Sequence, residues 1–169
     1  MKERLLSVLI LMAFAIGLAV PIGPVVASGN PRTAFTGIEG ANHCYDLTPD
    51  PRCTPGTLVT LPSGKTMLAN TINIIDFQTS DPRFTGQIVV DFTFYPSTPQ
   101  GTSGTGTFQF YPNMVDGYWE GMVALTLPST GGVHSKFSAT GYGEMEGLML
   151  MGTNTNGLIE GTITRVGLP

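Results

Sequence analysis

The sequence has few charged side chains and none of the common catalytic or nucleotide-binding motifs. Only 12% of the 169 residues are charged, whereas 22 are glycine, a composition that favours strands and turns over solvated helices. The chain lacks a Gly-x-Ser-x-Gly nucleophile motif, a phosphate-binding loop, a His-Glu-x-x-His zinc motif and an EF-hand loop. Two histidines, His43 and His134, have no neighbours typical of a catalytic site. We therefore expect no metal ion and no cofactor.

Long hydrophobic runs are also missing, except at the N-terminus. Lys2 and Arg4 precede an apolar run of 16 residues from Leu5 to Val20, and a segment broken by Pro and Gly then ends at Ala27. This pattern predicts a secretory signal peptide over residues 1–27. The run is shorter than the ~20 residues needed to span a bilayer, so we expect a secreted, extracytoplasmic protein without stable membrane insertion after cleavage.

Basic residues are scarce in the remaining chain. Removal of residues 1–27 leaves eleven acidic and six basic side chains, a net charge of −5. Proteins that bind nucleic acid need a basic surface to contact the phosphates, so the composition argues against nucleic acid as a partner. Residues 28–169 have the length of a single domain and are sufficient to bury one hydrophobic core.

Only two cysteines are present, Cys44 and Cys53, and both lie in the part of the chain that would be exported. In an oxidising compartment such a pair is expected to form a disulfide, and the entropy of closing this short loop predicts a stabilisation of ~2–3 kcal/mol. His43 is adjacent to Cys44, but these residues do not have the spacing of a known zinc site. A structural disulfide is therefore the predicted state.

No segment after the predicted signal peptide shows the apolar repeat of an amphipathic helix. Short runs rich in Val, Ile, Thr, Phe and Tyr instead alternate with clusters of Gly, Pro, Asn and Ser, which is typical of strands joined by turns. The predicted strands cover residues 32–39, 57–61, 65–78, 84–95, 104–111, 118–127, 133–141, 142–151 and 157–166. The sequence therefore predicts an all-β domain.

Alternation within these strands predicts one buried and one solvent-facing side. About eight strands joined in sequence leave no free edges if they close into an antiparallel up-and-down barrel, and a two-sheet β-sandwich is the second choice. An outer-membrane barrel is disfavoured, because the aromatic residues do not form two girdles. The residues predicted to line the lumen of the barrel are Phe92, Phe94, Phe108, Phe110 and Trp119.

Several glycine-containing segments resemble those of a known superfamily. They are Asp81-Pro82-Arg83-Phe84-Thr85-Gly86, Gly104-Thr105-Gly106-Thr107-Phe108, Gly117-Tyr118-Trp119-Glu120-Gly121 and Gly141-Tyr142-Gly143-Glu144-Met145-Glu146-Gly147. Across residues 81–150 the chain is similar to the allene oxide cyclase-like and dirigent-type proteins, which are eight-stranded antiparallel barrels. The resemblance implies a barrel whose lumen holds an apolar or aromatic small molecule that is either cyclised or oriented. It assigns a functional role to no residue of this chain.

A tripeptide consisting of an apolar residue, Glu and Gly occurs four times. The copies are Ile38-Glu39-Gly40, Trp119-Glu120-Gly121, Met145-Glu146-Gly147 and Ile159-Glu160-Gly161. Alternation predicts that the apolar residue and the glycine face inward, where glycine lets the strand bend, while Glu faces solvent. The predicted strand 142–151 has no clearly polar face. Glu146 is therefore the lead candidate for a catalytic residue if the protein is an enzyme.

These observations leave three functions open. The preferred one is a non-catalytic module that binds a small apolar ligand in the barrel lumen. A barrel without a pocket, acting as a structural or surface-interaction protein, is the first alternative. The second is a cyclase or isomerase with an inward-facing glutamate, because burial in a lumen shifts the pKa of a carboxyl group. Eight strands are just wide enough either to be filled by side chains or to hold one ligand.

Overall fold

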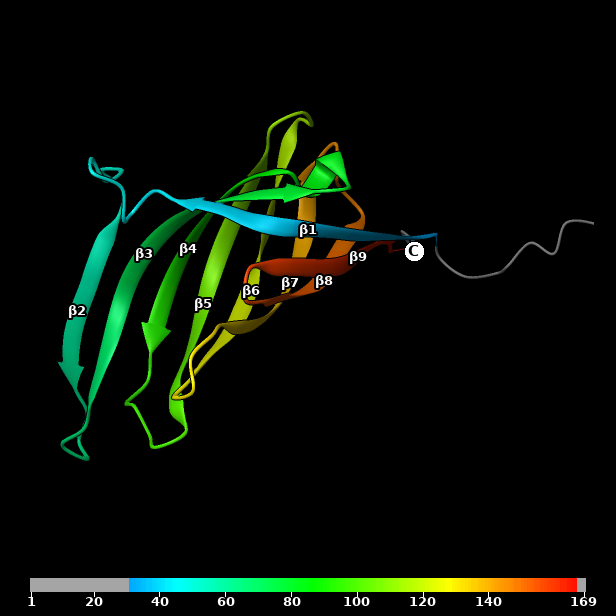
Figure 1. Ribbon diagram of the computed structural model, residues 1–169. Helices are drawn as coiled ribbons and strands as arrows, with labels where there is room; N and C mark the ends of the chain where they lie inside the picture. The colour runs from blue at the N-terminus through cyan, green and yellow to red at the C-terminus, as the bar shows by residue number, and fades with distance from the viewer. Residues whose placement is uncertain (1–30, 167–169) are drawn as a thin grey trace, which may run out of the picture.

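The computed structural model describes residues 31–166, and the predicted signal peptide lies outside this range. Within it the chain forms nine strands and one short 3₁₀ helix (Figure 1). The elements are β1 (Arg32–Asn42), β2 (Thr54–Thr60), β3 (Thr66–Thr79), η1 (Pro82–Phe84), β4 (Gly86–Phe94), β5 (Gly101–Pro112), β6 (Gly117–Pro128), β7 (His134–Gly143), β8 (Leu148–Thr155) and β9 (Leu158–Arg165). The prediction of an all-β domain is confirmed.

The strands form one antiparallel sheet that closes on itself. The strands β3 to β9 are neighbours in chain order, β9 pairs with β1, and β1 pairs with β3. Eight strands thus make a ring, and β2 extends the sheet outside it by pairing with β3. This arrangement is the predicted up-and-down barrel with one additional strand, and it is not a two-sheet sandwich. Closure pairs backbone groups that the edges of an open sheet would expose.

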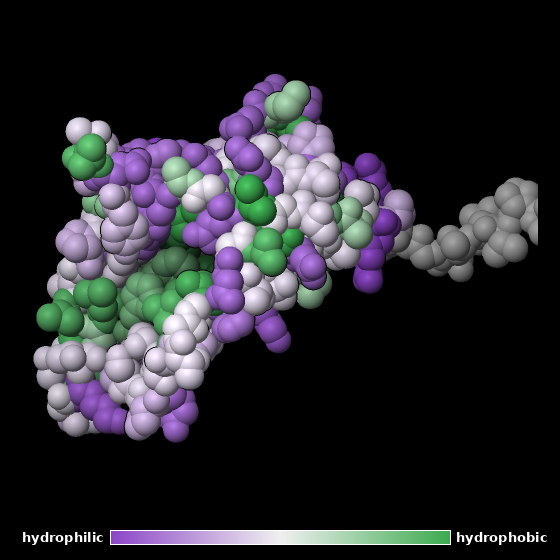
Figure 2. Space-filling model, in the orientation of Figure 1, coloured by the Kyte–Doolittle hydropathy of each residue, from purple (hydrophilic) through white to green (hydrophobic). Residues whose placement is uncertain are grey.

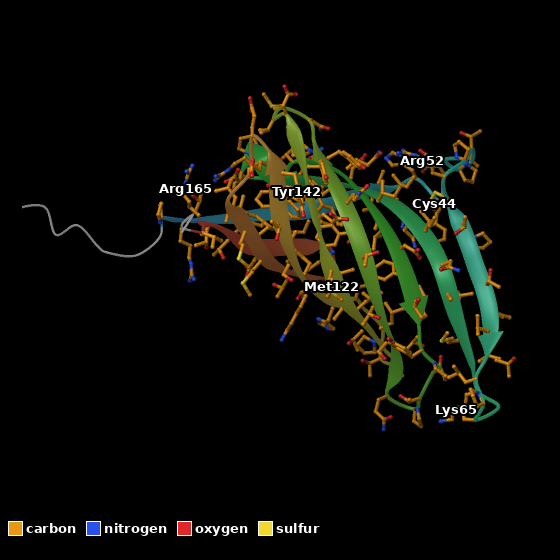
Figure 3. The ribbon with its side chains drawn as sticks, turned by 180° about the vertical axis from the view of Figure 1, so that it is seen from behind. Cys44, Arg52, Lys65, Met122, Tyr142 and Arg165 are labelled. Atoms are coloured by element: carbon orange, nitrogen blue, oxygen red, sulfur yellow. A yellow bond between two sulfur atoms is a disulfide. The ribbon has the colours of Figure 1, made fainter. Side chains whose placement is uncertain are left out.

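The strands β1 and β2 lie end to end along the same edge of β3. Strand β1 pairs with residues 75–79 of β3, and β2 pairs with residues 66–72. The segment between them loops out, and the predicted disulfide between Cys44 and Cys53 is present, with Cα atoms 5.5 Å apart (Figure 3). It holds the ends of the loop together at the point where β1 ends and β2 takes its place along β3.

One end of the barrel is filled by aromatic side chains around Phe84, which ends η1 and has no exposed surface. Its ring centroid lies 4.4–5.6 Å from those of Phe35, Phe77, Phe110 and Phe137. The fully buried Trp119 donates a hydrogen bond from Nε1 to the carbonyl oxygen of Arg83 at 2.7 Å. Aromatic pairs contribute ~0.5–1.5 kcal/mol each beyond the area they bury, so this end of the lumen is a packed core.

The prediction of a strand over residues 142–151 is wrong in its first half. Strand β7 ends at Gly143, a turn follows, and β8 begins only at Leu148. Gly143 and Gly147 have φ values of 71° and 76°, in the left-handed region that glycine adopts without strain. Met145 is fully buried within the turn, whereas Glu146 is exposed. The two glycines determine the local structure here, and the apparent alternation between them does not reflect a strand.

Candidate functional site

The barrel is open at the end away from Phe84. Strand β1 leaves the edge of β3 after Asn42, and the β8–β9 turn lies against β1, where the Glu39 amide donates to the Gly157 carbonyl oxygen at 2.7 Å. The strands β3 to β6 continue past this level, so part of their inner face is not covered by β1, β8 or β9 (Figure 1). A hollow with hydrophobic walls is visible below β1 and beside β2 (Figure 2).

This hollow contains a cavity of about 220 Å³ with mostly apolar walls. Strand β4 contributes Phe92 and Phe94, and β6 contributes Val123, Leu125 and Leu127. Each of these residues is separated from the next by one residue of the other face, so both strands present an apolar inner side. Ligand pockets are typically concave and apolar with a few convergent polar groups, and the composition of this cavity is of that kind.

Two further hollows, of about 440 and 710 Å³, adjoin the cavity, and Phe94 lines all three. The first lies under the disulfide loop and includes Cys44 and Tyr45, whereas the second includes Lys65 at the β2–β3 turn. Cross-strand pairing places five inner residues in one row across β2 to β6, namely Leu58, Leu68, Phe94, Gly104 and Leu125. The three hollows together form a trough, which we call the open trough.

Two glycines of β5 shape the floor of the open trough. A Cβ atom at Gly104 would lie 3.1 Å from Cδ1 of Phe94, and one at Gly106 would lie 3.1 Å from Cδ1 of Phe92. The absence of side chains at these two positions therefore leaves room for the two rings of β4 to lie across β5. The Gly-x-Gly-x-Phe segment of the sequence is thus explained by packing against its neighbouring strand.

Polar side chains lie on one side of the cavity. Glu39 is half-buried, and its Oε2 accepts a hydrogen bond from Nδ2 of Asn154. Asn154 is only 5% exposed, and its Oδ1 accepts from the Gly157 amide at 2.9 Å. Nearby, Nδ2 of Asn42 donates to Oδ1 of Asn73 at 3.3 Å. Of the described residues that line the cavity, only Glu39 carries a formal charge.

Glu39 was not predicted to face inward, because the first tripeptide is oriented opposite to two of the others. Trp119 and Ile159 are fully buried, and the glutamates that follow them are exposed. In β1, however, Ile38 is 51% exposed and Glu39 lines the cavity. The signal in the sequence was the aromatic Phe35, which is buried in the structure. Residues four apart on a strand share a face, so an inward Phe35 places Glu39 inside as well.

The structure separates the residues that the sequence predicted as a lumen lining. Phe92 and Phe94 line the cavity, whereas Phe108, Phe110 and Trp119 do not; the core that contains Phe84 includes these three residues and also Phe92. The candidate Glu146 is exposed in the β7–β8 turn, and its side chain is not among those that line the cavity.

Thr71 has a buried hydroxyl without a hydrogen-bond partner among the described residues. Its side chain is 9% exposed, and it lines the hollow under the disulfide loop. A Cβ atom at Gly56 on β2 would collide with Oγ1 of Thr71, so the glycine leaves room for this hydroxyl. An unpaired buried hydroxyl costs ~1–3 kcal/mol.

Charged side chains stabilise the disulfide loop, and one pair connects it to β3. His43 contacts Asp76 through Nε2 at 2.9 Å and Asp46 through Nδ1 at 3.2 Å, and its pKa is raised, chiefly by the hydrogen bond to Asp76. Arg52 contacts Asp50 at 2.8 Å, and its hydrogen bonds lower the pKa of Asp50 to about 2. These pairs fix the loop that carries Tyr45 over the open trough.

Within residues 31–166, no group of three or more His, Cys, Asp or Glu side chains could hold a metal ion. The same part of the chain contains no helix that is long and apolar enough to cross a membrane. Comparison of the chain with family models, curated proteins and solved structures gave no match. The function must therefore be inferred from the open trough and its polar side.

Proposed function

We propose that this protein is a non-catalytic binding module in which the open trough holds a small apolar ligand. The observation that carries the proposal is the contrast between the two ends of the lumen. Around Phe84 the barrel is filled by its own side chains, whereas the other half leaves an apolar cavity of about 220 Å³. Binding of a ligand that removes this apolar surface from water lowers the free energy.

The size of the cavity supports a compact ligand. Pockets for drug-sized molecules typically measure ~300–1,000 Å³, which is more than this cavity alone provides. The neighbouring hollows extend it on either side of Phe94, so a longer molecule would have to lie across that ring. A small aromatic or branched aliphatic body that rests on Phe92 and Phe94 is therefore the ligand that the walls fit best.

The proposal is tested with a neutral apolar dye and a matched pair of variants on β6. We expect N-phenyl-1-naphthylamine to bind with increased fluorescence. Leu125 faces the cavity and Met122 is 63% exposed on the outer face of the same strand. Leu125→Trp should fill the cavity and reduce dye affinity about tenfold or more, because the aromatic body of the dye can then no longer be buried there. Met122→Trp should leave the affinity unchanged.

Circular dichroism would establish that both variants fold, so that a loss of dye binding reports on the cavity. If the wild-type protein does not bind the dye, or if both variants bind it as the wild type does, the binding proposal is wrong. The alternative of a structural or surface-interaction protein would then be preferred.

A second candidate is a cyclase or isomerase that works in the same lumen, and the observation in its favour is the inward carboxylate of Glu39. Glu39 and Asn154 both line the cavity, and Asn154 donates to this carboxylate, which could accept a proton from a bound molecule. To distinguish the two functions, a molecule that co-purifies with the protein is extracted and identified by mass spectrometry. Re-added to wild-type protein, it should remain unchanged if the protein only binds. Conversion that is lost in Glu39→Gln would instead support the enzyme.

A further inference from the structure

We propose that the ligand carries a hydrogen-bond donor, preferably a protonated amine, which pairs with the carboxylate of Glu39. This inference rests on the proposed binding function and specifies the chemical class of the ligand. It follows from the position of a single negative charge in a cavity with mostly apolar walls. It excludes fatty acids and other carboxylates as preferred ligands.

The carboxylate of Glu39 is held in place by neighbours that do not neutralise it. Asn154 donates to its Oε2, and Asn154 is itself fixed by the amide of Gly157 and is almost fully buried. None of the ion pairs found among residues 31–166 involves Glu39. An ionised carboxylate has two oxygens that together accept about four hydrogen bonds, so the bond from Asn154 leaves most of this capacity free.

The environment of Glu39 favours a ligand cation over a ligand anion. The carboxylate is half-buried beside the apolar side chains of β4 and β6, where charges interact more strongly than in water. An ammonium group placed there would form a charge-assisted hydrogen bond, which is about twice as strong as a neutral one. A ligand carboxylate at the same position would be repelled and would lose its own hydration.

Among the described residues, the only positive charge that lines the open trough lies at the β2–β3 turn. Lys65 belongs to the β2–β3 turn and lies at the opposite end of β2 from Cys44 (Figure 3). It is exposed and borders the outer hollow, not the cavity that Glu39 lines. The cavity itself therefore favours a donor or a cation, and Lys65 provides the competing possibility that the experiment must test.

The experiment compares three probes that share one aromatic body. Displacement of N-phenyl-1-naphthylamine is measured at neutral pH with 2-naphthylmethylamine, 2-naphthylmethanol and 2-naphthoate, which are cationic, neutral and anionic. We expect the amine to bind about tenfold more tightly than the carboxylate, the magnitude of a hydrogen bond to a charged group, with the alcohol between them. Glu39→Gln should remove most of this preference, while Glu160→Gln, which changes an exposed glutamate of β9, should preserve it.

The outcomes distinguish the inference from the function on which it rests. If none of the probes displaces the dye, or if the dye itself does not bind, the binding function fails. If all three displace it equally, the function stands and the proposed pairing with Glu39 is wrong. Tighter binding of 2-naphthoate that is lost in Lys65→Gln would also overturn the inference and would place the polar end of the ligand at the β2–β3 turn.

Discussion

At the scale of single residues, the repeated apolar-Glu-Gly tripeptide has a different explanation in different copies. In the copy on β9, Ile159 is fully buried, Glu160 is exposed, and Gly161 leaves room for the ring of Phe35. In the copy between β7 and β8, the glycine has a positive φ and closes a turn. Only Glu39 lines the cavity, so the four glutamates do not form one acidic site.

The copy on β9 allows a direct test of which of its residues matters for stability. A Cβ atom at Gly161 would lie 2.6 Å from the carbonyl oxygen of Met151 and would also overlap the ring of Phe35. Gly161→Ala should therefore lower the free energy of unfolding by ~1–3 kcal/mol. Glu160→Gln should change it by less than about 0.5 kcal/mol, because the side chain is exposed. Urea denaturation of both variants measures the difference, and similar values for the two would contradict the packing role of the glycine.

At the scale of elements, β1 and β2 share one edge of β3 and are separated by the disulfide loop. Strand β1 joins β9 through residues 32–38 to β3 through residues 37–42, whereas β2 pairs only with β3, so the ring is closed along β1 and open along β2. His43 follows β1 directly, and its amide donates to the carbonyl oxygen of Ile74 at 2.9 Å. The loop is thus held to β3 by a backbone hydrogen bond, a disulfide and the contact between His43 and Asp76.

The position of His43 predicts a pH dependence of stability. Its folded-state pKa is raised above 6.5 by the hydrogen bond to Asp76, with further contributions from the charge of Asp76 and from Asp46, while partial burial opposes the shift. Because the folded state holds this proton more tightly, the stabilisation is fully present below pH 6.5 and is lost as the pH rises through the folded-state value.

We therefore expect the stability difference between wild type and His43→Gln to be larger at pH 5.5 than at pH 8.5, as measured by urea denaturation. His134, which is exposed on β7, provides the control, since His134→Gln should leave the pH dependence unchanged. A difference for His43→Gln that stays constant between these two pH values would show that the imidazole contributes no proton-linked stability.

At the scale of the whole molecule, the lumen is divided into a packed half and an open half. Phe84 is central to the packed half, whereas Leu125 and Leu127 line the open one. Phe77 and Phe137 contact Phe84 and also line the cavity, so these two rings connect the halves. Stability should depend most on Phe84, and binding most on the residues of the open half. The arrangement is consistent with a barrel in which one end supplies the core and the other is available for function.

Phe84→Ala tests this division. Removal of a fully buried ring that contacts four others should lower the free energy of unfolding by ~3–5 kcal/mol. The folded variant should still bind N-phenyl-1-naphthylamine with nearly wild-type affinity, because Phe84 reaches the cavity only through Phe77 and Phe137 and does not line it. Chemical denaturation and dye titration measure the two effects separately. Loss of dye affinity in a variant with a native circular dichroism spectrum would show that the two halves are coupled.

Much of the fold could be predicted from the sequence because its signals are local. Alternation in segments such as 87–95 and clusters of Gly, Pro, Asn and Ser identified the strands. The disulfide was indicated by the presence of only two cysteines in a chain predicted to be exported. The candidate site was less accessible to prediction. Phe92 and Phe110 have the same pattern of neighbours, yet the former lines the cavity and the latter packs on Phe84.

By itself, the sequence determined the structural class and the antiparallel order of the strands, because side-chain alternation and turn residues act over a few positions. Only the tertiary structure decided which half of the lumen is filled and that Glu39 is the carboxylate that faces it. Both depend on contacts between residues far apart in the chain, namely the packing of Phe84 between β1, β5 and β7 and the pairing of β1 with both β9 and β3.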